Sequence, residues 1–153
     1  MIDNGGFEAN GWGSWLAGGA VMPDVISGGH TVDRAVRLGG SGGLAWLRQE
    51  LSVPEDLVDA TLSFLVRRDD AAAGTSTLTV ELAGTPISRT QVISTAAWAH
   101  VWLPVDAAAG QATTLTFTVS GSPTVRLDEV SLGSAVTGGS QVQLPLVFRA
   151  GTP

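Results

Sequence analysis

The sequence predicts an all-β domain, a two-sheet antiparallel β-sandwich, and three observations predict it. Of the 153 residues, 20 are glycine and 14% are charged, against roughly 25% charged in an ordinary soluble domain. Short runs that alternate apolar and polar residues are separated by turns that are rich in Gly or contain Pro. No window of 11 residues or more shows a helical period. A chain of this length buries a core of its own, so we expect one domain over residues 1–133.

The expected strands follow one another at spacings of about 8–12 residues, which is typical of sandwiches. In chain order they are residues 2–8, 15–17, 31–38, 44–53, 59–68, 77–83, 87–93, 98–105, 112–119 and 124–132. Residues 18–29 are expected to form a loop, because Pro23 and two Gly pairs mark turns there.

Alternation within these strands assigns a core face and an outer face to each of them. The residues assigned to the core face are Leu47, Gln49, Leu51, Val53, Ala60, Leu62, Phe64, Val66, Leu78, Val80, Leu82, Val101, Leu103, Val105, Leu115, Phe117 and Val119. The outer faces carry Trp46, Arg48, Glu50, Thr79, Glu81, Trp98, His100 and Trp102. Aromatic and charged side chains therefore gather on the outer faces.

Composition excludes several classes of function. The net charge is −6 and the chain has no Lys, so without a basic patch we expect no nucleic-acid partner. No run of about 20 apolar residues is present, so we expect no membrane span. The chain has no Cys, only two His, no Gly-x-Ser-x-Gly elbow and no phosphate-binding Gly loop with Lys. We therefore expect a non-catalytic protein.

Two acids stand beside apolar residues that should be buried. Glu8 follows Phe7 directly, and Asp128 follows Leu127 in the last expected strand. A carboxylate beside a core needs a cation or a set of N–H donors. Glu8 and Asp128 could share one cation, since the first and last strands of a domain are often neighbours. Alternatively they cap turns, or pair with nearby arginines, namely Arg34 and Arg126.

The same two stretches carry a resemblance. An opening Asn4-Gly5-Gly6-Phe7-Glu8, a Trp a few residues on, and a closing Leu127-Asp128-Glu129-Val130-Ser131-Leu132 resemble the galactose-binding-like jelly rolls. Many carbohydrate-binding modules of secreted bacterial proteins belong to that superfamily. The resemblance covers about residues 2–133. It implies a jelly-roll sandwich, a glycan partner and a secreted or cell-surface parent protein.

The resemblance also implies one structural calcium that ties the two ends of the domain together. Its ligands here would be Glu8 and Asp128, with carbonyl oxygens from Asn4 and from the loop over 27–31. This chain departs from the related pattern at Gly28-Gly29-His30, where Ser-Gly-Ser is more usual, but ligation by backbone carbonyls does not depend on those side chains.

Aromatic and polar residues on the outer faces are candidates for sugar binding. Aromatic rings stack on the apolar face of a pyranose, while Arg, Glu and His hydrogen-bond its hydroxyls. The candidate ligand-binding residues are Trp102, Trp46, His100, Arg48, Trp12, Arg67 and Glu81. The alternative for any tryptophan is packing, and we expect that role for Trp15 and Trp98. The lack of Tyr weakens the sugar hypothesis, because Tyr is common at such surfaces.

A Gly/Ser-rich linker is expected over residues 134–140, followed by an apolar C-terminal tail over 141–153. An apolar segment on a flexible linker can add to the edge of a sheet, in its own chain or a neighbouring one. The alternative function is therefore a structural or assembly domain of a cell-surface or filament protein that self-assembles through this tail. Equally, the tail could fold back on its own sandwich.

Overall fold

The computed structural model describes residues 1–9, 11–70, 73–92, 97–105 and 110–134, and every regular element among them is a β-strand. The strands are β1 (Leu16–Gly19), β2 (Asp24–Ser27), β3 (Arg34–Gly39), β4 (Ala45–Ser52), β5 (Ala60–Arg68), β6 (Ser76–Leu82), β7 (Thr85–Val92), β8 (Ala99–Pro104), β9 (Ala112–Gly121) and β10 (Thr124–Ser134). The described part of the chain contains no helix with the length and hydropathy to span a bilayer.

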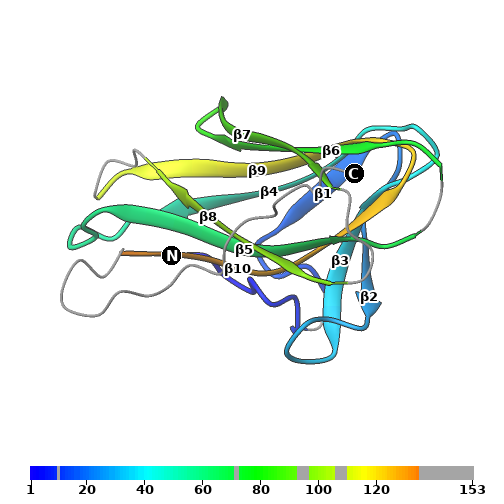
Figure 1. The fold of residues 1–153 in the computed structure, drawn as a ribbon. Coiled ribbons are helices and arrows are strands. Elements are labelled where there is room, and N and C mark those ends of the chain that lie inside the picture. The colour runs from blue at the N-terminus through cyan, green and yellow to red at the C-terminus, as the bar shows by residue number, and fades with distance from the viewer. Residues whose placement is uncertain (10, 71–72, 93–96, 106–109, 135–153) are drawn as a thin grey trace, which may run out of the picture.

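The strands form two five-stranded sheets that pack face to face (Figure 1). Sheet A has the order β1-β4-β9-β6-β7, and sheet B has the order β2-β3-β10-β5-β8. Every neighbouring pair is antiparallel. This arrangement confirms the predicted two-sheet antiparallel sandwich.

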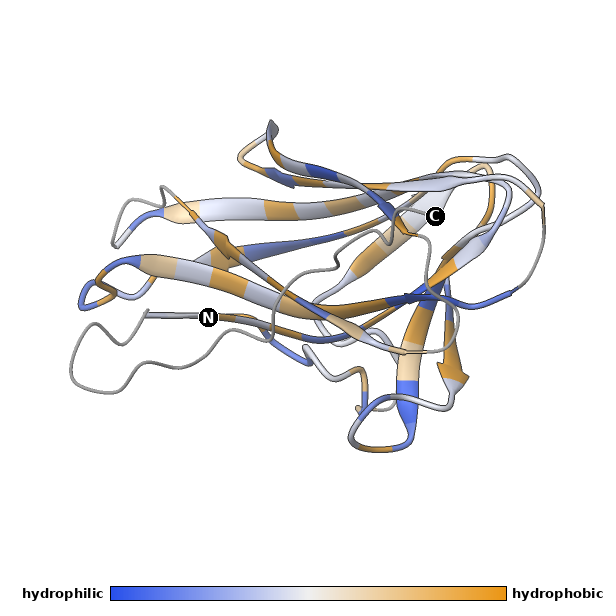
Figure 2. Ribbon diagram, viewed as in Figure 1, coloured by the Kyte–Doolittle hydropathy of each residue, from blue (hydrophilic) through white to orange (hydrophobic). Residues whose placement is uncertain are grey.

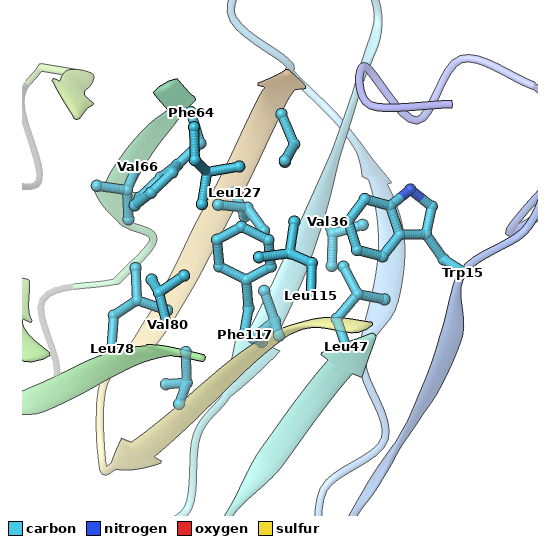
Figure 3. Close-up of a cluster of buried hydrophobic side chains, with 14 of the residues drawn as sticks. Trp15, Val36, Leu47, Phe64, Val66, Leu78, Val80, Leu115, Phe117 and Leu127 are labelled. Atoms are coloured by element: carbon cyan, nitrogen blue, oxygen red, sulfur yellow. The ribbon is translucent and has the colours of Figure 1, made fainter. Parts of the chain in front are cut away.

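The core lies between the sheets and follows the predicted alternation, which appears as alternating colours along the strands in Figure 2. The assigned core residues are buried, except that Val101 and Leu103 of edge strand β8 pack half-buried against the core. Phe64 of sheet B meets Phe117 of sheet A edge to face, with ring centroids 5.2 Å apart (Figure 3). Burial of these side chains is the main stabilising term of the fold.

Two of the expected local structures are wrong. Residues 2–8 form turns and not a strand, because Asn4 and Phe7 adopt φ angles of 49° and 57°. The expected loop over 18–29 contains the short strand β2, which lies at the edge of its sheet and pairs with β3.

The N-terminal turn is nevertheless fixed to both sheets. The side-chain amide of Gln49 exchanges two hydrogen bonds with the backbone of Asp3, at 2.8 and 2.9 Å. This contact gives hydrogen-bond partners to the side-chain amide of a Gln that is buried on the core face of sheet A. On sheet B, the N–H of Val130 donates to the carbonyl of Gly5 at 2.9 Å.

The predicted domain boundary falls within the end of β10, which includes Gly133 and Ser134. The rest of the predicted linker and the whole predicted tail, residues 135–153, lie outside the described residues.

Candidate functional site

The structure divides the candidate sugar-binding residues between the two opposite outer faces of the sandwich. Sheet A carries Trp46, Arg48 and Glu81. Sheet B carries Arg67, His100 and Trp102. Trp12 precedes β1 and packs, partly buried, against the core. The seven residues therefore do not form one site.

On sheet A, the register places three polar residues in one row across adjacent strands. Arg48 of β4 and Glu81 of β6 both pair with Thr116 of β9, which lies between them. Strands are about 4.8 Å apart, so Arg48 and Glu81 are separated by roughly 10 Å of open sheet. We call Arg48, Thr116 and Glu81 the sheet A row. It places a guanidinium, a hydroxyl and a carboxylate side by side.

Trp46 lies in the next row, and a glycine beside it leaves room for the indole to lie against the sheet. It pairs with Gly18 of β1, and a Cβ atom at Gly18 would come within 2.4 Å of Cζ2 of the indole. The indole therefore rests on strand β1, over a backbone that carries no side chain. The guanidinium carbon of Arg48 lies 5.2 Å from the Trp46 ring centroid, within cation–π range.

Residues not among the sugar-binding predictions complete this face. Hydroxyls of Thr114, Thr118 and Thr79 face outward from β9 and β6 beside the sheet A row. Leu16 of β1 is 54% exposed, and Leu44, just before β4, is 46% exposed. Alternation predicted that Thr79 points outward, but only the strand order shows that Thr118 pairs with both Trp46 and Thr79.

On sheet B, the aromatic residues line the outer face of edge strand β8. The rings of His100 and Trp102 stack with centroids 3.8 Å apart at 31°. Trp98, just before the strand, meets the edge of His30 at 6.0 Å, and the guanidinium carbon of Arg67 lies 4.9 Å from its centroid. Trp98 is half-buried, as its expected packing role requires, but its contacts are polar and aromatic.

Two histidines and one carboxylate adjoin this surface. Nδ1 of His30 lies 3.2 Å from Oε1 of Glu129, which sits on the β-bulge of β10 with φ 49°. Burial lowers the pKa of His100; the Glu129 carboxylate partly opposes this shift, and His30 adds to it.

The two predicted calcium carboxylates each accept backbone N–H groups. Oε1 of Glu8 accepts from the N–H of Arg34 at 2.8 Å. Asp128 is 2% exposed, and its two oxygens accept from the N–H groups of His30 and Glu129, each at 2.7 Å. These backbone N–H groups thus supply part of the stabilisation that a carboxylate beside the core was predicted to require. The alternative pairing with Arg126 is not formed, because that residue pairs with Asp69.

Asp128 is also under electrostatic strain. Burial raises its pKa above the ordinary value; the two N–H donors oppose the shift, while the carboxylates of Glu129 and Glu8 add to it. Glu8 therefore acts electrostatically on Asp128, as two carboxylates that share a site do. A cation between them would offset both the cost of burying the Asp128 charge and the repulsion between the carboxylates.

The backbone carbonyls that were predicted as further calcium ligands accept hydrogen bonds within the protein. The carbonyl of Asn4 accepts from the N–H of Phe7 and from Nε1–H of Trp15. Trp15 was predicted to pack, and it is buried, with 2% of its surface exposed. The carbonyls of Ser27 and Gly28 accept from Nη1 of Arg126. Among the described residues, no group of three His, Asp or Glu side chains is arranged to hold a metal ion. Charge therefore favours a cation here, but the side chains alone do not form a complete ligand set.

A depression of about 640 Å³ lies at the hairpin between β2 and β3, and Ser27 and Gly28 also line it. Val25, Val32, Asp33 and Arg34 are among its lining residues. None of the candidate sugar-binding residues lines it, so we do not place the sugar site there.

No family model matches the chain, and no curated protein matches it. Solved structures do match in fold. A structure of TmCBM61 in complex with β-1,4-galactotriose has a TM-score of 0.67 at 18% identity, over 88% of this chain and 97% of that one. The CBM22-1 xylan-binding domain of Paenibacillus barcinonensis Xyn10C has a TM-score of 0.60 at 19% identity, over 86% and 93%. A family 35 carbohydrate-binding module from Clostridium thermocellum has a TM-score of 0.57 at 14% identity, over 79% and 92%.

These similarities show that the chain has the jelly-roll fold of carbohydrate-binding modules, as the resemblance at its two ends predicted. These three structures are of carbohydrate-binding or xylan-binding modules.

Proposed function

We propose that this chain is a non-catalytic carbohydrate-binding module of a secreted or cell-surface protein, and that it binds a glycan on the outer face of sheet A. The observation that carries the proposal is the sheet A row beside Trp46. An aromatic ring, a guanidinium and a carboxylate share one open face there, with hydroxyls between them.

Each group has a separate task on this face. The Trp46 indole lies on β1, where it can stack on the apolar face of a pyranose. Arg48 donates hydrogen bonds and Glu81 accepts them, so the pair at opposite ends of the sheet A row fixes the orientation of sugar hydroxyls. The open face suits an extended chain that crosses the strands better than a single enclosed sugar.

The fold similarity suggests which glycans to try first. One structural neighbour is in complex with β-1,4-galactotriose and another is a xylan-binding domain. We infer that the ligand is a neutral, β-linked polysaccharide of this kind.

The proposal is tested by isothermal titration with oligosaccharides of β-1,4-galactan and xylan. Trp46→Ala should lower affinity by about thirtyfold or more, since stacking and apolar contacts of an aromatic anchor are worth about 2 kcal/mol or more. Trp102→Ala, on the opposite face, is the matched control and should bind the neutral glycan as the wild type does. Loss of binding in Trp102→Ala but not in Trp46→Ala would move the site to the other sheet.

We also propose a structural calcium ion held by the carboxylates of Glu8 and Asp128. The proximity of the two carboxylates and the raised pKa of Asp128 support it. When bound, the ion would supply charge neutralisation and no chemistry. Its role would be to fix the N-terminal turn against β10 and the loop that precedes β3.

A further inference from the structure

We propose that the outer face of sheet B carries a second glycan site, which recognises the carboxylate of an acidic sugar through Arg67. The inference rests on the proposed function, because it adds a uronate-containing glycan to the ligands of the same module. It differs in face, residues and ligand charge from the site at Trp46.

The first observation is a row of three arginines across adjacent strands. Arg67 of β5 pairs with Arg126 of β10, and Arg126 pairs with Arg37 of β3. Like charges in such positions repel. Arg126 is neutralised by Asp69, and Arg37 by Asp24. Within the described residues, Arg67 is the member of the row that has no carboxylate partner.

The second observation is how the Arg67 guanidinium is held. Its carbon lies 4.9 Å from the Trp98 ring centroid, so the indole fixes its position. Its Nε atom is buried and has no hydrogen-bond partner in the described part of the chain. An unpaired buried donor on a charged group is unfavourable. An anion beside the guanidinium would remove the unpaired charge.

The other charged groups near this face do not fill that role. Glu129 is engaged by Nδ1 of His30 at 3.2 Å. His100 carries a lowered pKa, chiefly from burial. Because the whole chain has a net charge of −6, attraction to an acidic glycan would act at short range, at Arg67 itself.

The neighbouring aromatic residues supply a surface for the sugar rings. Trp98 lies just before β8, and His100 and Trp102 follow on the outer side of the strand, where their rings stack at 3.8 Å. β8 is the edge of sheet B, so a polymer can pass across it. Paired N–H groups of a guanidinium match the two oxygens of a carboxylate, which a uronate supplies.

Affinity electrophoresis would compare polygalacturonate with the same polymer after its carboxyl groups are reduced to alcohols. We expect the wild type to prefer polygalacturonate and Arg67→Gln to lower that affinity about tenfold or more, as for hydrogen bonds to a charged group. Arg67→Lys should fall between the two. Arg89→Gln is the control, since it removes the same charge from exposed strand β7 of sheet A.

Equal losses in Arg67→Gln and Arg89→Gln would mean general electrostatic attraction and would overturn the inference. Equal binding of a sulfated galactan would show that the site reads charge and not a carboxylate. If the wild type binds neutral galactan or xylan but not polygalacturonate, the second site is refuted while the proposed function stands. If it binds none of these polymers, both fail.

Discussion

At the scale of single residues, the proposed sugar site depends on the absence of a side chain at Gly18 as much as on the presence of the Trp46 indole. The Trp46 indole occupies the space where a side chain at Gly18 would stand. A glycine in a strand weakens it through lost entropy and contacts. Here it allows an aromatic ring to lie against the strand beside it.

Substituting Gly18 should therefore weaken sugar binding without touching any polar group. In Gly18→Ala the new Cβ would come within 2.4 Å of the indole, so Trp46 must leave its position. We expect lower affinity for the neutral glycan by titration calorimetry. Gly133→Ala, whose Cβ meets nothing within 4 Å, is the control and should bind normally; unchanged binding in Gly18→Ala would contradict the assigned position of the ring.

His100 gives a second prediction at this scale, and it concerns pH. Its folded-state pKa lies below the ordinary value of 6.5, so the unfolded chain binds the proton more readily. The free energy of unfolding is therefore not reduced by His100 above pH 6.5, and it falls as the pH drops below 6.5 because the unfolded chain takes up the proton first. His100→Phe keeps an aromatic ring against Trp102 and should lose less stability on acidification than the wild type does. Urea unfolding of both proteins at several pH values measures this difference. Parallel losses in the two proteins would refute the assignment.

At the scale of elements, the N-terminal turn joins the two sheets through backbone contacts. Gly5 lies so close to β10 that a Cβ there would be 1.9 Å from the carbonyl oxygen of Val130. At Gly6 the nearest atom would be Cγ of Glu8, 3.8 Å away. Neighbouring glycines thus differ sharply in what they tolerate.

We expect Gly5→Ala to lower the free energy of unfolding by about 1–3 kcal/mol, as overpacking typically does. Gly6→Ala should change it little. Urea unfolding of both variants measures the difference. Equal stabilities would mean that the turn is not packed against β10 in solution.

The proposed calcium belongs to the same element. Chelation should lower the melting temperature of the wild type, because a ligand bound only to the folded state at 100 times its Kd stabilises it by about 2.7 kcal/mol. Glu8→Gln and Asp128→Asn should remove this sensitivity, and Glu50→Gln, on exposed surface, should keep it. A wild type whose melting is the same with and without chelator would rule the ion out.

At the scale of the whole molecule, alternation was enough to predict the core but not the site. Residues such as Leu47 and Phe117 are buried as predicted, because a strand in a sandwich turns every second residue inward. Arg67 and Glu81 both point outward, as predicted. Their separation onto opposite faces depends on which strands pair, and that is decided by contacts far apart in the sequence.

Local backbone geometry accounts for the rest. The left-handed conformations of Asn4 and Phe7 turn the first segment out of a strand, although its apolar residues suggested one. β2 has four residues, too few for alternation to show. The contact of Arg67 with Trp98 likewise could not be predicted, since it needs β5 and β8 to be neighbours.

The most direct test of the central claim is hydroxyl-radical footprinting of the five tryptophans, with and without a galactan or xylan oligosaccharide. We predict that the ligand protects Trp46 from oxidation and leaves Trp102 and Trp98 unchanged. Protection of Trp102 or Trp12 with no change at Trp46 would contradict the placement of the neutral-glycan site on sheet A.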